Sequence, residues 1–70
     1  MEVFEIAMSR SSTVRKALKL LRLKHWKFSI ETNPMKKSKL RVVIKRITDQ
    51  SYADQSGKEY NQILGALQDA

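Results

Sequence analysis

The residues of this sequence whose types could do chemistry are its lysines and arginines, and they are clustered. Thirteen of the fourteen lie between Arg10 and Arg46, where the single acid is Glu31. The flanking segments, residues 1–9 and 47–70, both carry net negative charge. Clustered cations with few local counter-ions repel one another, a cost that is offset when a polyanion binds in their field. The charge distribution therefore predicts an anionic partner.

No other group of residues predicts catalysis or metal binding. The chain has no cysteine and one histidine, His25. It can therefore form neither a disulfide nor a thiolate or histidine-based zinc site. Its remaining acids lie toward the two ends, without the pairing that general acid–base catalysis needs. They are Glu2, Glu5, Asp49, Asp54, Glu59 and Asp69. We expect a non-enzymatic protein with no cofactor and no metal.

Length and hydropathy limit the class of protein further. A chain of 70 residues makes one small domain, residues 1–70, and buries only about 60% of its unfolded surface. Its uninterrupted apolar runs, such as residues 42–44, are far shorter than the ~20 residues that a spanning helix needs. The start is acidic and lacks the basic and apolar regions of a secretory signal. We expect no integral membrane insertion and a cytoplasmic location, with the nucleus as the alternative.

The first half of the chain predicts a strand, a helix and a second strand. Residues 2–8 have the period of two that is typical of a strand, with Phe4, Ile6 and Met8 on one side and Val3, Glu5 and Ala7 on the other. Residues 9–13 are polar and rich in helix-capping types, and an apolar period of three and four then runs from Val14 to about Leu23. The cations of this helix, Arg15, Lys16, Lys19 and Arg22, occupy the flank opposite the apolar stripe. Alternation from Trp26 to Ile30 predicts the second strand.

The second half predicts a hairpin and a final helix. Asn33 and Pro34 are a turn signal, because proline fixes φ and restricts the residue before it. Residues 40–47 form the most β-branched strand, which we expect at the centre of the sheet. Residues 48–55 read as a polar connection anchored by Tyr52. Ser56 and Glu59 fit a capping box ahead of a last helix, whose core-facing residues are Tyr60, Ile63, Leu64 and Leu67.

These elements, in the order β-α-β-β-α, predict a small α+β sandwich: a three-stranded sheet with two helices on one face. We place the third strand between the first and the second. The first strand then lies at an edge, where its unpaired N–H and C=O groups invite pairing with a second chain. A weak homodimer through this strand is expected.

Residues 3–32 resemble the opening unit of thioredoxin-like and arsenate-reductase-like proteins, with a strand, a serine-rich turn, a helix containing Arg15, Lys16 and Ala17, and a strand containing Phe28. The redox cysteines that such families need at the turn are absent, and their places fall near Ser11 and Val14. The resemblance therefore implies nothing about activity.

The clustered cations favour a nucleic-acid-binding protein that contacts the phosphate backbone of RNA or DNA. Lysines at the tip of the predicted hairpin can reach phosphates without disturbing the core. Cations on the open face of the sheet would extend this surface, and that face carries no aromatic side chains for base stacking. Trp26 and Phe28 are assigned to the core instead. The predicted contacts are Lys27, Lys36, Lys37, Lys39, Arg41 and Lys45, with Arg15, Lys19 and Arg22 as a second patch.

Two alternatives stay open. The protein could be an interaction module, a small inhibitor or adaptor whose basic surface docks on an acidic protein. Exposure of Leu20, Leu23 or Met35 would favour this reading, because protein interfaces need an apolar hot spot. It could also be a peripheral domain on anionic membrane lipids. That function needs an apolar helix face that is free to insert, whereas Val14, Leu18 and Leu21 are assigned to the core.

Overall fold

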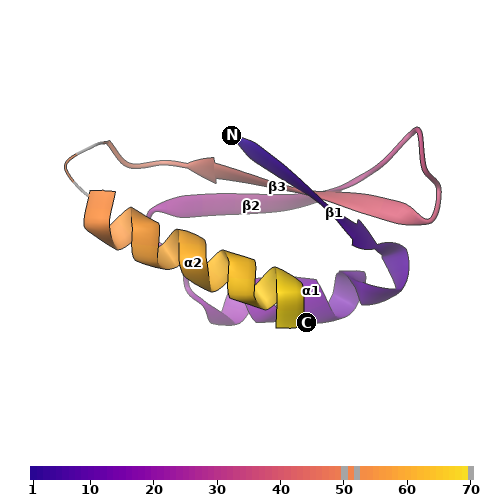
Figure 1. Ribbon diagram of the computed structural model, residues 1–70, viewed down its shortest axis with the longest axis horizontal. Coiled ribbons are helices and arrows are strands. Elements are labelled where there is room, and N and C mark those ends of the chain that lie inside the picture. The colour runs from indigo at the N-terminus through magenta and orange to yellow at the C-terminus, as the bar shows by residue number, and fades with distance from the viewer. Residues whose placement is uncertain (50, 52, 70) are drawn as a thin grey trace.

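The elements follow one another in the predicted order in a computed structural model, which describes residues 1–49, 51 and 53–69. Strand β1 is followed by a short 3-10 turn, η1, and then by helix α1, the hairpin strands β2 and β3, and helix α2 (Figure 1). Their bounds are Glu2–Ala7 for β1, Met8–Arg10 for η1, Ser11–Leu20 for α1, Trp26–Thr32 for β2, Lys39–Arg46 for β3 and Ala53–Asp69 for α2.

Strand β3 lies at the centre of the sheet and pairs antiparallel with both neighbours, which gives the order β1-β3-β2. The register places Phe4 opposite Val42 and Phe28 opposite Ile44. Apolar residues of the three strands therefore share one face, because side chains alternate along a strand. The predicted fold class and strand order are confirmed.

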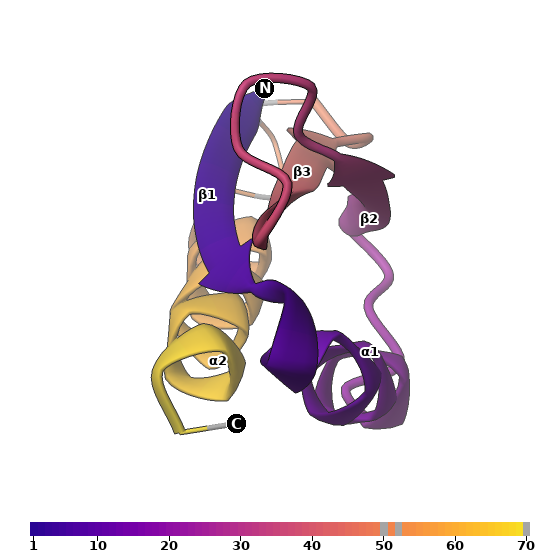
Figure 2. The same ribbon diagram turned by 90° about the vertical axis from the view of Figure 1, so that its right-hand side faces the viewer.

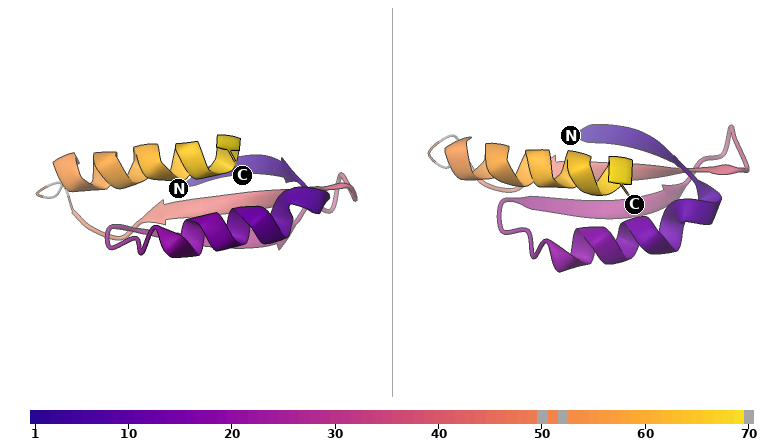
Figure 3. Two further views of the ribbon diagram at one scale, coloured as in Figure 1. Left: turned by 90° about the horizontal axis from the view of Figure 1, so that it is seen from below. Right: turned by 60° about the horizontal axis from the view of Figure 1, so that its bottom comes forward.

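Both helices cover that apolar face. Viewed end-on, α2 lies under β1 and α1 under β2 (Figure 2), and from below the two helices run side by side in opposite directions (Figure 3). The sheet and the helices enclose one cluster of buried side chains, which leaves the other sheet face to solvent. The buried apolar residues are Ile6, Val14, Leu18, Val42, Ile44, Ile63 and Leu67.

Helix α1 begins and ends about three residues earlier than predicted. It starts at Ser11, and neither Arg10 at its N-cap nor any other side chain makes a capping hydrogen bond there. The expectation that the serines of this segment cap the helix is therefore wrong. The helix ends at Leu20. Arg22 follows in the left-handed region with φ of 50°, a backbone conformation that does not continue a right-handed helix. This turn brings Leu23 against the core.

The predicted capping box is also wrong, because α2 begins at Ala53 and Ser56 lies within it. Ser56 is buried, and its hydroxyl donates to the carbonyl of Ala53 at 3.0 Å. Glu59 reaches across to another element, where its carboxylate accepts the backbone N–H groups of Lys24 at 2.8 Å and His25 at 2.9 Å. The Ser56 hydroxyl thus bonds within the first turn of α2, and a tertiary contact takes Glu59 away from a local cap. Tyr52, the predicted anchor of the preceding connection, lies outside the described residues.

Side chains also tie α2 to the rest of the fold at its two ends. The Arg10 guanidinium donates a hydrogen bond to the Leu67 carbonyl at 2.5 Å. The carbonyl groups in the last turn of a helix have no partner within the helix, and this bond supplies one. Near the start, the indole N–H of Trp26 donates to the carbonyl of Ser56 at 2.8 Å. Further along, the ring of Tyr60 packs against the indole with centroids 5.4 Å apart. The only tryptophan of the sequence thus joins β2 to α2.

Tyr60 should titrate above its usual range. A hydrogen bond between its hydroxyl and the Glu2 carboxylate raises the Tyr60 pKa, and burial adds to the effect. Since the folded pKa exceeds the unfolded one, this contact stabilises the fold fully below about pH 10 and is lost as pH rises through the folded pKa. In a Tyr52→Phe background, absorbance titration should show Glu2→Gln lowering the Tyr60 pKa. Identical titrations with and without Glu2 would contradict the contact.

Candidate functional site

The cations on the open sheet face fall into two groups with different surroundings. In the half of the sheet next to the β2–β3 hairpin, Arg41 is opposed by Glu5 on one side and by Glu31 on the other. Directly opposed side chains have Cβ atoms about 5 Å apart. No direct ion pair joins these three residues, but the two carboxylates offset the charge of Arg41. The open face is therefore not uniformly basic, because the strand register places two acids among its cations.

One of the hairpin lysines pairs with one of the same acids. Lys36 Nζ lies 3.5 Å from Glu5 Oε1, in an ion pair between two exposed side chains. Lys37 is exposed and Lys39 is half-buried. The loop itself is folded into turns, with the Lys36 N–H donating to the Asn33 carbonyl, and it is held to the body of the protein by the Met8 N–H donating to the Ser38 carbonyl. The predicted turn at Asn33 is confirmed.

The opposite end of the open sheet face has cations without this compensation. Lys27 of β2 and Lys45 of β3 are directly opposed in the register, and both side chains are exposed. Like charges in directly opposed positions destabilise a sheet. Within residues 1–49, 51 and 53–69, neither lysine makes an ion pair. The strand pair therefore holds two close positive charges with no carboxylate partner.

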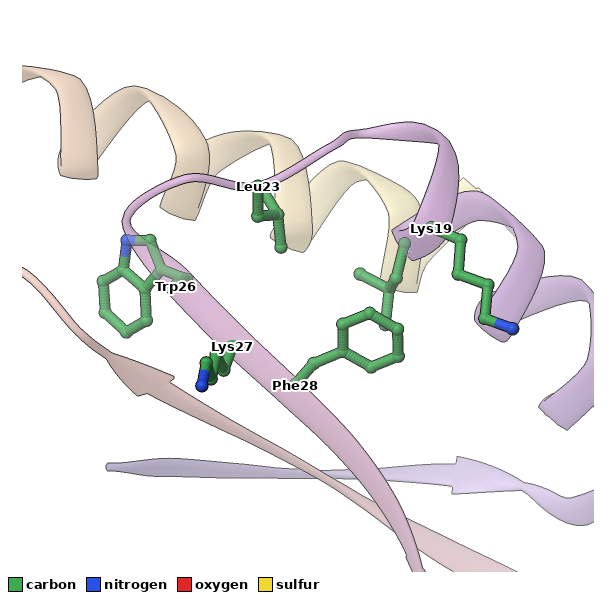
Figure 4. Close-up of a pocket in the computed structure, with 6 residues that line it drawn as sticks. Lys19, Leu23, Trp26, Lys27 and Phe28 are labelled. Atoms are coloured by element: carbon green, nitrogen blue, oxygen red, sulfur yellow. The ribbon is translucent and has the colours of Figure 1, made fainter.

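Helix α1 adds to this second group. Lys19 and Lys27 are both among the residues that line a cavity of about 260 Å³ between α1 and β2 (Figure 4). The Lys27 side chain projects from the open face of the sheet, because it alternates with Trp26 and Phe28, and Lys19 lies on the exposed flank of the helix. Arg15 lies one turn before Lys19 on the same side of the helix, at the i, i+4 spacing, and is exposed. We call Arg15, Lys19, Lys27 and Lys45 the edge cluster, since β2 is an edge strand.

The tertiary structure divides the predicted contact residues differently from the sequence. From the sequence, Lys27 and Lys45 are predicted to contact phosphates together with the hairpin lysines, and Arg15 and Lys19 to form a second basic patch. The structure places Lys27 and Lys45 on the open sheet face, and Arg15 and Lys19 on α1, the helix under β2 on the other face. It leaves Lys36, Lys37, Lys39 and Arg41 toward the other end of a molecule 39 Å long. Arg22 is exposed just beyond the end of α1.

The cavity beside the edge cluster has apolar walls. Besides the two lysines, it is lined by Leu18, Leu23, Trp26 and Phe28. Both aromatic rings are half-buried and pack against the core, so the assignment of Trp26 and Phe28 to the core holds, although each ring also borders the cavity. Figure 4 shows the Phe28 ring between β2 and α1, below Lys19, with Leu23 above. The cavity is thus mainly apolar, and Figure 4 shows the Lys19 side chain directed away from it.

One contact near the site has no signal in the sequence pattern. The imidazole of His25 lies 3.4 Å from the Glu59 carboxylate, and both side chains are largely buried. The two residues are 34 positions apart in the chain, so only the packing of α2 against β2 brings them together. Glu59 thus contacts His25 and the backbone just before β2. These contacts hold α2 against the start of β2.

A second, more apolar groove lies between the two helices. It has a volume of about 460 Å³, and Leu20 at its border has 81% of its surface exposed. A Cβ atom added to Gly65 would meet nothing within 4 Å, so this glycine does not serve a close approach of two backbones. The groove is lined by Thr13, Ala17, Leu20, Leu21, Gln62, Gly65 and Ala66.

The remaining structural findings are negative. Among residues 1–49, 51 and 53–69, no three histidine, aspartate or glutamate side chains gather where they could hold a metal ion. No helix in this described part of the chain is both long and apolar enough to cross a membrane. The chain matches no model of a protein family, no curated protein and no solved structure.

Proposed function

We propose that this protein binds nucleic acid through the phosphate backbone, with the edge cluster as the principal contact and Lys36, Lys37 and Lys39 as a second one. The proposal is supported above all by the opposed pair Lys27 and Lys45, two exposed cations that repel each other without a carboxylate between them. A row of phosphates would relieve that repulsion. Arg15 and Lys19 extend the positive surface from the strands to the adjacent helix.

The net charge of +7 supports a polyanion over a single small anion. Nucleic acids have closely spaced phosphates, and a protein that neutralises several of them gains affinity by releasing condensed counterions. The edge cluster has side chains from two strands and a helix, so its cations can follow a backbone across the edge of the sheet. Contacts of this kind position a strand without reading its sequence.

The salt dependence of binding tests the proposal. With four phosphates neutralised by the edge cluster, log K should fall with log salt at a slope of about −3.6 for duplex DNA and −2.8 for a single strand. Gel shift or fluorescence anisotropy between 50 and 200 mM salt measures the slope, and sequences of different composition should bind alike. Absence of binding to DNA and RNA at low salt would refute the proposal.

A second candidate function is supported by the groove between the helices. Leu20 is an exposed apolar side chain of the kind that protein interfaces bury, and Lys16 lies one turn before it on α1. An acidic amphipathic helix from a partner protein would match both the groove and its positive border. Binding of such a peptide, reduced by Leu20→Ser while nucleic acid binding is absent, would establish this alternative.

Membrane binding receives less support from the same geometry. The apolar stripe of α1 that would have to enter the lipid contains Val14 and Leu18, which are 0% and 1% exposed. Insertion would require the core to open. Liposomes containing anionic lipid therefore serve as a control, and we expect them to bind only through charge and to release the protein as salt is raised.

A further inference from the structure

We propose that the free edge of β2 receives an extended peptide from a partner protein as a fourth strand of the sheet. One apolar side chain of the peptide enters the cavity between α1 and β2, and an acidic one lies opposite Lys27 on the other face. This inference goes beyond the proposed function, because it concerns a protein ligand and holds whether or not the cations bind nucleic acid.

The unpaired backbone groups of β2 follow from the strand register. In an antiparallel pair, hydrogen-bonded residue pairs alternate with pairs that make no bond to each other. The Ile47 N–H donates to the His25 carbonyl at 2.9 Å, so every second residue of β2 after His25 bonds to β3. The residues between them direct their N–H and C=O groups outward, where no strand pairs with β2 in the described part of the chain. These outward-facing residues are Trp26, Phe28, Ile30 and Thr32.

An extended peptide satisfies such an edge. It supplies a donor and an acceptor to each outward-facing residue, whereas phosphates supply acceptors only. A second copy of this chain fits the edge less well. Because α1 lies under β2 (Figure 2), antiparallel pairing of two β2 strands would bring the exposed cations Arg15 and Lys19 of both α1 helices into one interface. A peptide without such a helix meets no repulsion there.

The cavity accounts for one face of the added strand. Side chains alternate between the two faces of a sheet, so every second residue of the peptide points toward the helices. On that face the cavity of about 260 Å³ lies between Phe28 and Leu23 (Figure 4). Pockets for drug-sized ligands usually measure about 300–1,000 Å³, so this one suits a single apolar side chain. Strand addition uses such pockets for specificity, while the backbone bonds supply affinity.

The charges of β2 specify the other face of the peptide. Lys27 and Glu31 lie four positions apart and both are exposed. Within residues 1–49, 51 and 53–69, Lys27 has no ion pair, and an acidic peptide residue directly opposite would give it one. A basic peptide residue would do the same for Glu31. The matching antiparallel peptide therefore has a basic residue, then an acidic one four positions later, with apolar residues at the helix-facing positions between them.

The probe is the labelled peptide Thr-Lys-Val-Thr-Leu-Glu-Phe. Antiparallel to β2, it places leucine opposite Phe28, lysine opposite Glu31 and glutamate opposite Lys27. We expect binding in fluorescence anisotropy, together with a change in the fluorescence of Trp26, the only tryptophan of the sequence and part of the cavity wall. Absence of binding up to about 1 mM peptide would overturn the proposal.

Two N-methylated forms of the probe test the backbone bonds on the unaltered protein. Methyl groups on the valine and leucine nitrogens remove donors that face β2, whereas methyl groups on the central threonine and glutamate nitrogens remove donors that point away. The first form should bind about 30-fold more weakly than the probe, roughly fivefold for each hydrogen bond lost. The second form should bind like the probe. Equal affinities of the two forms would contradict strand addition.

A probe with its lysine and glutamate exchanged tests the register. It has the same composition, but it sets like charges opposite Lys27 and Glu31, so we expect it to bind about fivefold more weakly. Lys27→Glu should abolish this preference, because each probe then has one matched and one mismatched pair. Lys37→Glu, the same change at an exposed hairpin position, should retain it. An unaltered preference in Lys27→Glu would show that the peptide does not lie along β2.

Amide hydrogen exchange, measured by NMR, distinguishes the possible occupants of the edge. In the free protein the N–H groups of Phe28 and Ile30 should exchange faster than those of Lys27 and Ser29, and the probe should slow them. Protection of Phe28 and Ile30 that grows with protein concentration would assign the edge to a second copy of the chain and overturn the proposal. A protein that binds the probe but neither DNA nor RNA would refute the proposed function and leave this inference intact.

Discussion

Replacing Lys19, Lys27 and Lys45 together by glutamine is expected to weaken single-strand binding by roughly 500-fold at 50 mM salt. Each phosphate contact contributes a slope of about 0.7 to the dependence of log K on log salt, which at this concentration amounts to about 0.9 log units per lysine. The three positions are exposed, so the core is untouched. The slope itself should shrink by about 2 units.

A matched variant distinguishes the two basic regions of the protein. Replacing Lys36, Lys37 and Lys39 by glutamine removes the same amount of charge. We expect a smaller loss, about tenfold or less, because Lys36 already pairs with Glu5 and one phosphate contact contributes about tenfold at this salt concentration. A larger loss from the hairpin variant would move the principal contact to the hairpin. Thermal unfolding of both variants provides the control for folding, and substitution of the edge lysines by arginine should retain binding.

Replacing Trp26 by alanine is expected to lower the free energy of unfolding by about 3 kcal/mol, the lower end of the usual range for an aromatic residue truncated in a core. The low end applies because the ring is half-buried. The variant loses the contact with Tyr60 and the hydrogen bond to the Ser56 carbonyl. In a domain of 70 residues this is a large part of the total stability.

Urea denaturation followed by circular dichroism measures this loss without relying on tryptophan fluorescence. Trp26→Phe is the matched control, since it keeps an aromatic ring against Tyr60 and removes only the indole N–H and part of the ring. We expect it to cost about 1 kcal/mol, the typical contribution of one hydrogen bond. An unchanged denaturation midpoint for Trp26→Ala would show that the ring is not part of the folded core.

The sequence by itself determined the elements and their order in the sheet. Alternation in the strands and the three-and-four spacing in the helices are local consequences of backbone geometry, so they can be read from residues close in the chain. The β-branched run at residues 40–47 also indicated the central strand correctly. The concentration of positive charge is likewise a property of the sequence, and it favours an anionic ligand whatever fold the chain adopts.

Only the tertiary structure decided where helices begin and which cations lie opposite carboxylates. Ser56 and Glu59 have the spacing of a local cap, yet packing buries the first and turns the second toward His25. The spacing of residues determines which local hydrogen bonds a segment can make, and contacts with distant segments determine which of them form.

The same reason explains the candidate site. The register of β3 against its neighbours puts Lys45 opposite Lys27, and Arg41 opposite two acids. The turn after α1 sets Lys19 beside the cavity at β2. Strand register and helix placement depend on the whole core, so the division of one basic stretch into a compensated half and an uncompensated half could not be read from the order of residues.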